Sequence, residues 1–239
     1  VYKYTFKSNM VAVVTNGTAV LGLGNIGAAA GLPVMEGKCA LFKEFGGVEA
    51  FPICLDSEDP EEVIRAVEML APQFGGINLE DIRSPECFEI ERRLEEKLDI
   101  PVFHDDQHGT AIIVTAALLN ALKVVGKQLK DVKIVHNGPG AAGTAIIKML
   151  QTAGATDITA VDEHGILYPG RPAGLADHKE WLAGVTNPRH LTGGLAEAVK
   201  GADVFIGTSV ANVLTPEMIK TMNKDAVVFA MANPNPEVM

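Results

Sequence analysis

The stretch that is most informative about the fold is residues 100–110, IPVFHDDQHGT. A short apolar run ends abruptly in two carboxylates, Asp105 and Asp106, and a long apolar helical pattern follows at once. This order predicts a strand, a charged strand end and then a helix. In an open α/β sheet, ligands bind outside the carboxyl ends of the strands, so a site is expected at this edge. The alternative is an ordinary helix start, because acids near a helix N-terminus complement its dipole.

A second strand ends in the same way. The apolar run of residues 77–79 is followed by Glu80 and Asp81, and helical patterns separate it from the strands on either side. Parallel strands joined by helices bring their carboxyl ends to one edge of the sheet, so the four acids are expected to converge. Carboxylates in such a group repel one another unless a cation joins them. An all-oxygen set favours Mg²⁺ or Mn²⁺ over zinc.

Lys38 is the candidate for general-base chemistry near this predicted metal site. It follows Gly37 and enters an apolar run, so we expect it in a turn. Partial burial there would lower its pKa toward the range of base chemistry, whereas an ordinary lysine is solvated. We interpret His104 and His108 as packing or hydrogen-bonding residues and not as metal ligands.

Two glycine-rich turns match the pattern GxGxxG, and the first of them, residues 22–27, lacks the context of a dinucleotide site. Before it, residues 11–15 and 19–23 predict two strands of a hairpin. After it come only a short helical run, residues 28–34, and no strand with a terminal acid at the required distance. We therefore interpret this motif as a tightly packed turn.

The second turn has the complete context. A strand at residues 132–135 precedes it, an apolar helix and a strand at residues 157–161 follow, and that strand ends in an acid. Glycines let the backbone approach a pyrophosphate, the helix N-terminus attracts it, and the acid holds ribose hydroxyls. Two later strand ends lie where the cofactor would pass. The expected cofactor residues are Gly138, Pro139, Gly140, Ala141, Ala142, Gly143, Asp162, Ser209 and Asn233.

Composition narrows the function classes. The 239 residues carry a formal net charge of -10 without a basic stripe, which argues against nucleic acid as a partner. Three cysteines without a CxxC pair suit a reducing compartment, so we expect a cytoplasmic protein. No segment has the sequence of a membrane span.

A polar stretch at residues 126–131 predicts a domain boundary. The expected class is α/β: a parallel-sheet catalytic domain at residues 1–126, followed by a Rossmann-type doubly wound NAD(P)-binding domain at residues 127–239.

Several motifs resemble the bacterial malic enzymes over essentially the whole chain. They are GTAVLGLGNIG, LPVMEGK, FGGINLEDI, PVFHDDQHGTA and ANPNPE, and the blocks GGINLEDI and FHDDQHGTA are the most specific. The resemblance implies oxidative decarboxylation of malate to pyruvate and CO₂, with NAD or NADP and with Mg²⁺ or Mn²⁺.

The resemblance also implies roles for single residues. It makes Lys38 the general base, places Asp105 beside the reacting centre and lets Asn233 contact substrate or nicotinamide. The metal ligands that it implies are Glu80, Asp81 and Asp106.

Two departures from the family pattern concern completeness. The general-acid tyrosine of the family has no counterpart in Tyr2, Tyr4 or Tyr168, and the later substrate segment of the family, of the type NQVNN, is not found in the sequence. A further departure is Pro139, where the family usually has Ala, so different pyrophosphate contacts are expected. We expect a fragment of a longer enzyme that turns over malate poorly.

Alternatives remain open. One is a 2-hydroxy-acid dehydrogenase that does not decarboxylate, and the other is a non-catalytic NAD-binding regulatory module. Asp162 slightly favours NAD, because a carboxylate repels a 2′-phosphate. We expect a small-molecule substrate, no membrane partner and a homo-oligomer, dimeric or higher.

Overall fold

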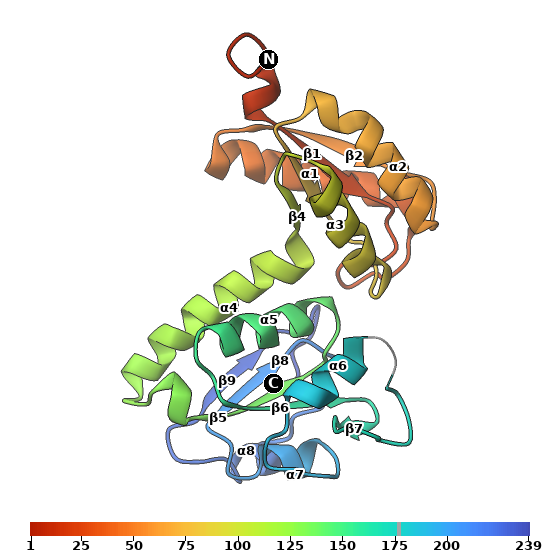
Figure 1. Cartoon of the computed structure of the whole chain (residues 1–239). Coiled ribbons are helices and arrows are strands. Elements are labelled where there is room, and N and C mark those ends of the chain that lie inside the picture. Colours follow the sequence, from red (N-terminus) through yellow and green to blue (C-terminus); the bar gives the residue numbers. More distant parts are fainter. Residues whose placement is uncertain (176–177) are drawn as a thin grey trace. The chain divides into compact units, whose positions relative to one another are not determined.

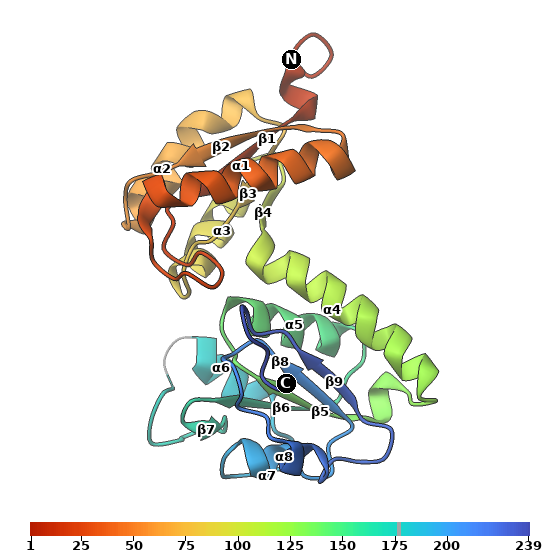
Figure 2. The same cartoon turned by 180° about the vertical axis from the view of Figure 1, so that it is seen from behind.

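The computed structural model describes residues 1–175 and 178–239, and the chain divides into two compact units, Val1–Asp106 and Gln107–Met239. Each unit is a sheet of mainly parallel strands with helices on both faces, which confirms the expected α/β class (Figures 1 and 2). The second unit begins at residue 107, whereas the expected boundary followed residue 126. Helix α4 (Asp105–Val124) explains the difference, because its buried residues belong to the core of the second unit. The assignment of a catalytic and a cofactor domain stays a prediction.

The sheet of the first unit has four parallel strands in the order β2-β1-β3-β4. Its strands are β1 (Met10–Thr15), β2 (Glu49–Cys54), β3 (Gly76–Leu79) and β4 (Val102–His104). Its helices are η1 (Phe6–Asn9), α1 (Gly27–Gly46), α2 (Pro60–Leu70), η2 (Ala71–Gln73) and α3 (Glu86–Lys97). In both views α1 covers one face of this sheet, and α2 and α3 cover the other (Figures 1 and 2).

Two expectations for this unit are wrong. Residues 19–23 do not return as a strand; they hold only an isolated bridge between Val20 and Gly24, and β1 pairs in parallel with β2 and β3 instead. The helix after the glycine motif is not short, because α1 runs for 20 residues and includes Pro33. Lys38 therefore lies inside a helix and not in a turn.

Close packing shapes the loop between β1 and α1. Gly17 has a φ of 69°, and a Cβ added to it would lie 2.3 Å from the carbonyl oxygen of Gly27. Only glycine fits such a position without strain. The first glycine motif thus begins α1 through a tight turn, and the absence of a cofactor there stays a prediction.

The sheet of the second unit has the order β7-β6-β5-β8-β9, in which only the edge pair β6–β7 is antiparallel. Its strands are β5 (Lys133–Asn137), β6 (Asp157–Asp162), β7 (Gly165–Ile166), β8 (Val204–Gly207) and β9 (Val227–Ala230). Besides α4, its helices are η3 (Leu129–Asp131), α5 (Ala141–Thr152), α6 (His178–Val185), α7 (Leu195–Val199) and α8 (Pro216–Ile219).

Alternate residues of these strands supply two hydrophobic cores. Ile134 and Ile206 pack in the core that also contains residues of α4 and α5. Their neighbours Val135 and Phe205 pack in the core that contains residues of α7. This alternation is the two-residue period of a strand that is buried on both faces. Within the described part of the chain, no helix is both long and apolar enough to cross a membrane.

Candidate active site

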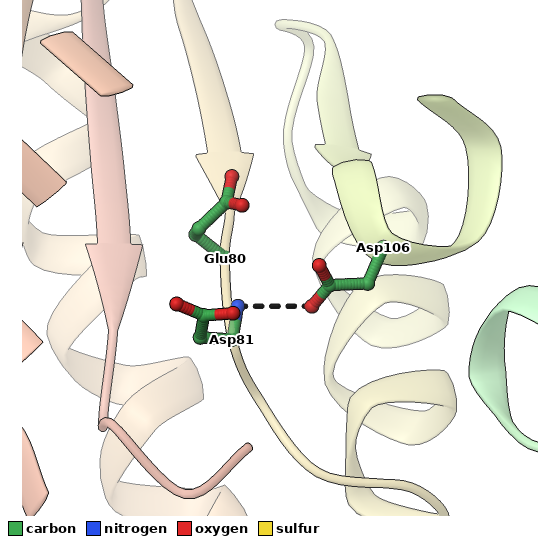
Figure 3. A group of neighbouring side chains, drawn as sticks. All are labelled: Glu80, Asp81 and Asp106. Carbon is green, nitrogen blue, oxygen red and sulfur yellow. Dashed lines mark hydrogen bonds between the residues drawn. The ribbon is translucent and has the colours of Figure 1, made fainter. Parts of the chain in front are cut away.

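Three carboxylates meet at the carboxyl edge of the first sheet. Glu80 and Asp81 follow β3, and Asp106 lies in the first turn of α4, directly after β4. The register pairs Leu79 with His104, so the two strands end side by side. One ligand oxygen from each of the three side chains lies within 4.8 Å of the others. Figure 3 shows the three side chains as neighbours. Three of the four acids that were expected to converge therefore form one cluster, and Asp105 lies outside it.

Burial makes this cluster electrostatically unfavourable. It raises the pKa of Asp106 to about 7, and the Coulombic repulsion of Glu80 and Asp81 adds to the shift. Burial also raises the pKa of both other carboxyls above the ordinary values. The backbone N–H of Asp81 donates to Asp106 Oδ2 at 3.0 Å, but the buried Oδ2 of Asp81 has no hydrogen-bond partner among the described residues.

Lys38 is the cation nearest to these acids in the first unit. Its Nζ lies 2.7 Å from Asp105 Oδ2 and 3.1 Å from Glu80 Oε2. Asn78 orients the second contact, because its Nδ2 donates to Glu80 Oε2 at 2.8 Å. The site thus unites the middle of α1 with the ends of β3 and β4.

The expected direction of the Lys38 pKa shift is wrong for this arrangement. Burial does act to lower the pKa, as the sequence analysis assumed. The hydrogen bond to Asp105 and the charges of Glu80 and Asp105 act against it and outweigh it, so the pKa of Lys38 lies above its ordinary value. As it stands, Lys38 is held as an ammonium ion.

The donor set fits a divalent cation. It consists of three carboxylates that bring hard oxygen atoms together from two strand ends, one of them an unpartnered buried oxygen. Such atoms are the ligands that Mg²⁺ and Mn²⁺ prefer. His104 is fully buried, and its Nε2 lies 3.4 Å from Asp106 Oδ2, so it contacts the cluster from its inner side.

The second unit carries the expected glycine turn between β5 and α5. Gly138 has a φ of 93°, and a Cβ there would lie 2.7 Å from the Thr208 carbonyl oxygen. A Cβ on Gly143 would lie 2.3 Å from the carbonyl oxygen of Gly138, whereas Gly140 has open space around it. Gly138 and Gly143 are thus packed too closely for a side chain. Gly140 has free space around it, so a ligand can approach the backbone there. Ala141 and Ala142 are the first residues of α5.

Pro139 lacks a backbone N–H, but it has a local partner. Its carbonyl oxygen lies 2.9 Å from His178 Nε2. This contact ties the turn to the first residue of α6. Whether its missing N–H changes the contacts to a pyrophosphate stays a prediction.

Asp162 ends β6 as expected, but it is already neutralised. Arg171 donates from both terminal nitrogens to the two carboxylate oxygens at 2.7 Å, and Lys179 Nζ lies 3.0 Å from Oδ2. Burial acts against ionisation, yet these hydrogen bonds outweigh it and lower the pKa of Asp162 to about 2. Neither cation is expected from the sequence, because neither belongs to the glycine pattern.

Ser209 and Asn233 follow β8 and β9, two parallel neighbours that end at the same edge as β5 and β6. The Ser209 hydroxyl accepts a hydrogen bond from Asn137 Nδ2 at 2.7 Å. The structure thus groups the predicted residues into two sets, one at each sheet edge. Their roles stay predictions.

Models of known protein families match both units. The model described as "Malic enzyme, N-terminal domain" matches residues 1–61 and 57–95, and "Malic enzyme, NAD binding domain" matches residues 107–238.

Individual relatives agree with these models. The chain is 58% identical over 239 residues to the bifunctional malic/malolactic enzyme of Bacillus subtilis and covers 100% of itself and 58% of that protein. It is 51% identical over 240 residues to the NADP-dependent malic enzyme of Escherichia coli, covering 100% of itself and 31% of that protein. A crystal structure of an NAD-dependent malic enzyme from Thermotoga maritima superposes with a TM-score of 0.98 at 53% identity, over 100% of this chain and 63% of that one. The chain thus spans less than two thirds of the length of each of these proteins.

Proposed function

Because the chain belongs to the malic enzyme family, we propose that it carries out, as part of a whole enzyme, the oxidative decarboxylation of malate to pyruvate and CO₂ with reduction of NAD or NADP. The observation that carries the proposal is the contact of one lysine with the acid cluster. Lys38 lies within 3.1 Å of Glu80 and within 2.7 Å of Asp105, beside the three carboxylates that fit a metal ion. A base next to a cation site is the arrangement that oxidation of a hydroxy acid followed by loss of CO₂ requires.

We assign the metal to Glu80, Asp81 and Asp106. A divalent cation bound there would supply Lewis-acid chemistry, polarising substrate oxygens and stabilising the negative charge left after loss of CO₂. Asn78 holds Glu80 in place through its 2.8 Å hydrogen bond, and the N–H of Asp81 does the same for Asp106. The protein therefore orients the proposed ligands before any cation arrives.

Lys38 is the proposed base for the substrate hydroxyl. It must first lose a proton, and the two carboxylates that contact it oppose this loss. Engagement of Glu80 by a cation would remove much of that opposition, since the carboxylate charge would then be shared. Asp105, 2.7 Å away, remains as the residue that directs the lysine.

The cofactor belongs in the second unit, where NAD or NADP would supply the hydride acceptor. The open backbone at Gly140 and the start of α5 would hold the pyrophosphate. A slight preference for NAD rested on repulsion between Asp162 and a 2′-phosphate. Arg171 and Lys179 weaken that argument, because they compensate the carboxylate charge. We therefore propose NAD(P) without a strong electrostatic bias.

The remaining functional expectations stay predictions. They are a homo-oligomer, a cytoplasmic location and malate as the small-molecule substrate. Product analysis separates the main alternative, because a dehydrogenase without decarboxylation would release a 2-oxo diacid and no CO₂. A regulatory module would bind no metal at all.

Metal binding is the first test of the proposal. Calorimetry with Mn²⁺ on the wild-type chain is expected to show one site, and Asp106→Asn to weaken it by at least roughly 10–100-fold, the loss typical of disturbed metal sites. The matched control is Asp99→Asn, which changes an aspartate of the same unit outside the cluster. Equal Mn²⁺ affinity in Asp106→Asn and the wild type would show that the ligands have been assigned wrongly.

A further inference from the structure

Glu237 is a fully buried acid at the carboxyl edge of the second sheet, with 0% of the residue exposed. Its Oε1 accepts the backbone N–H of Ser209 at 2.8 Å and the hydroxyl of the same residue at 3.2 Å. Its Oε2 accepts the backbone N–H of Ala232 at 2.9 Å. One carboxylate therefore joins the segments that leave β8 and β9.

The backbone around Glu237 is fixed as well. Its carbonyl oxygen accepts the N–H of Leu214 at 2.9 Å, and the Pro236 carbonyl oxygen accepts the N–H of Asn212 at 3.1 Å. The loop after β9 is thus fastened to the loop after β8 at several points. This leaves the carboxylate little freedom to move.

Gly207, the last residue of β8, makes room for the carboxylate. A Cβ added to Gly207 would lie 2.4 Å from Glu237 Cδ and 2.5 Å from Oε1. Those distances exclude any side chain at residue 207 while the carboxylate stays in place. The strand end and the acid therefore fit each other.

The same hydrogen bonds extend to the glycine turn. Ser209 Oγ accepts from Asn137 Nδ2 at 2.7 Å, and Asn137 directly precedes Gly138. Thr208 Oγ1 donates to the Gly138 carbonyl oxygen at 2.8 Å. A continuous set of contacts thus links the carboxylate with the first residue of the expected pyrophosphate turn.

Burial of a carboxylate is unfavourable unless hydrogen bonds replace its water. Among the described residues, the partners of Glu237 are two backbone N–H groups and one hydroxyl, and no basic side chain forms a salt bridge with it. An apolar side chain would fill this space at lower cost, so the carboxylate is explained better by the loops that it holds than by packing alone.

We propose that Glu237 is a positioning residue for the nicotinamide half of the cofactor. The inference rests on the proposed cofactor site of the second unit. Asp162 marks the adenosine side of that site, beyond β6, so the other half of a dinucleotide lies beyond β8 and β9. Glu237 holds both segments there, including Ser209 and the residue before Asn233. It acts through these residues and needs no contact with the cofactor.

Comparison of whole and half cofactors tests this role. Calorimetry measures the Kd of the reduced cofactor that the wild type binds more tightly, NADH or NADPH, and of its adenosine half, 5′-AMP or 2′,5′-ADP. Glu237→Gln keeps the shape but turns an NH₂ group toward a backbone donor, so the Kd of the whole cofactor is expected to rise about tenfold or more. The Kd of the adenosine half is expected to stay near the wild-type value.

Asp203→Asn is the matched control. Asp203 is also buried and accepts a backbone N–H, that of Lys133, but it precedes β8 at the opposite end of the strand. It is expected to lower the melting temperature without changing either Kd. Glu237→Asp is the milder second variant, which keeps both oxygens but is too short to reach both loops. It is expected to show the same selective loss to a smaller degree.

The outcomes separate the two proposals. Failure of the wild type to bind either reduced cofactor would overturn the proposed function, and this inference with it. Normal binding by the wild type together with unchanged affinity in both Glu237 variants would overturn the inference alone. Equal loss of whole cofactor and adenosine half in folded variants would also overturn it, because the carboxylate would then only support the fold.

Discussion

Asp106 and Asp162 are the same type of residue in the same kind of place, at the carboxyl end of a parallel strand, yet their pKa values are shifted in opposite directions. Burial and neighbouring acids raise the pKa of Asp106 to about 7. Hydrogen bonds from Arg171 and Lys179 lower the pKa of Asp162 to about 2. The position of an acid at a strand end therefore does not determine its pKa. The charges and hydrogen-bond donors around the carboxyl group determine it.

The two sites differ in how far their own side chains balance the carboxylate charge. The first site has an excess of negative charge that a bound cation could balance, whereas the second is balanced by its own basic residues. The site of the first unit has Glu80, Asp81, Asp105 and Asp106 against the single Lys38. The Asp162 site has an arginine and a lysine within 3.0 Å of one carboxylate. We therefore expect the first site to gain stability from a cation and the second to gain none.

Removal of Arg171 is expected to have the largest effect. Its guanidinium is buried against Asp162, so Arg171→Met removes both charged hydrogen bonds of a buried carboxylate that keeps only Lys179 as a cation. The variant should lower the free energy of unfolding by about 3–5 kcal/mol. Urea denaturation measures the loss. Arg92→Met is the control, since its ion pairs with Glu89 and Glu96 are exposed and such pairs contribute little to stability. Equal losses in the two variants would show that Asp162 does not depend on Arg171.

Asp162→Asn is expected to have a smaller effect. The arginine keeps carbonyl partners at Gly165, Ala173 and Gly174, so the variant should lose only about 2–3 kcal/mol at neutral pH. Because the folded-state pKa of about 2 lies below the ordinary 3.8, this stabilisation is fully present above pH 3.8 and is lost as the pH falls through about 2. Urea titrations across that range give the curve. A difference that grew on acidification would contradict the assigned shift.

Asp106→Asn is expected to change stability in the opposite direction. The folded-state pKa of about 7 lies above the ordinary 3.8, so the contribution of Asp106 is fully present below pH 3.8 and is lost as the pH rises through about 7. With a chelator at pH 8, the asparagine variant should therefore be more stable than the wild type. The gain is on the order of 1 kcal/mol, since Asp106 is partly exposed and its shift is screened.

Added Mn²⁺ should reverse this order. It is expected to stabilise the wild type by about 2.7 kcal/mol at a hundred times its Kd, and Asp106→Asn, with roughly 10–100-fold lower affinity, by only about 0.4–1.4 kcal/mol. Thermal melting with chelator and with Mn²⁺ measures both states. If the chelated variant is less stable than the wild type, the acids of this cluster do not oppose one another.

Lys179→Gln is expected to have the smallest effect on stability, because Lys179 makes one contact with Asp162 and its side chain is partly exposed. We expect a loss of at most about 1 kcal/mol. The loss of positive charge should also uncover the repulsion between Asp162 and a 2′-phosphate, raising the Kd of NADPH relative to that of NADH. Fluorescence titration of both cofactors gives the ratio of the two Kd values. An unchanged ratio would show that Lys179 does not influence the preference between NADH and NADPH.

Much of this fold could be predicted because its signals are local. Alternating apolar strands and helical patterns indicated the parallel sheets, and two strands with terminal acids indicated where Glu80 and Asp106 meet. The glycine turn at residues 138–143 was recognisable from its flanking strands and from the acid at Asp162.

Other features depend on tertiary contacts, which local sequence patterns do not predict. Pro33 and Gly37 suggested a break, but both lie inside α1, so tertiary packing overrides local propensity there. The bidentate contact of Arg171 with Asp162 depends on how the segment after β7 folds back. Burial alone predicts a lowered pKa for Lys38, yet the acids that raise its pKa come from the segment after β3 and from the start of α4.

Gly207 and Glu237 also have a consequence for how this protein can change over generations. The carboxylate occupies the place where a side chain at residue 207 would begin. A lineage that acquires even alanine at 207 must therefore shorten or move residue 237, and one that loses the acid frees 207 to vary. We expect the two positions to be inherited as a pair across related sequences, thirty residues apart in the gene but under one shared constraint.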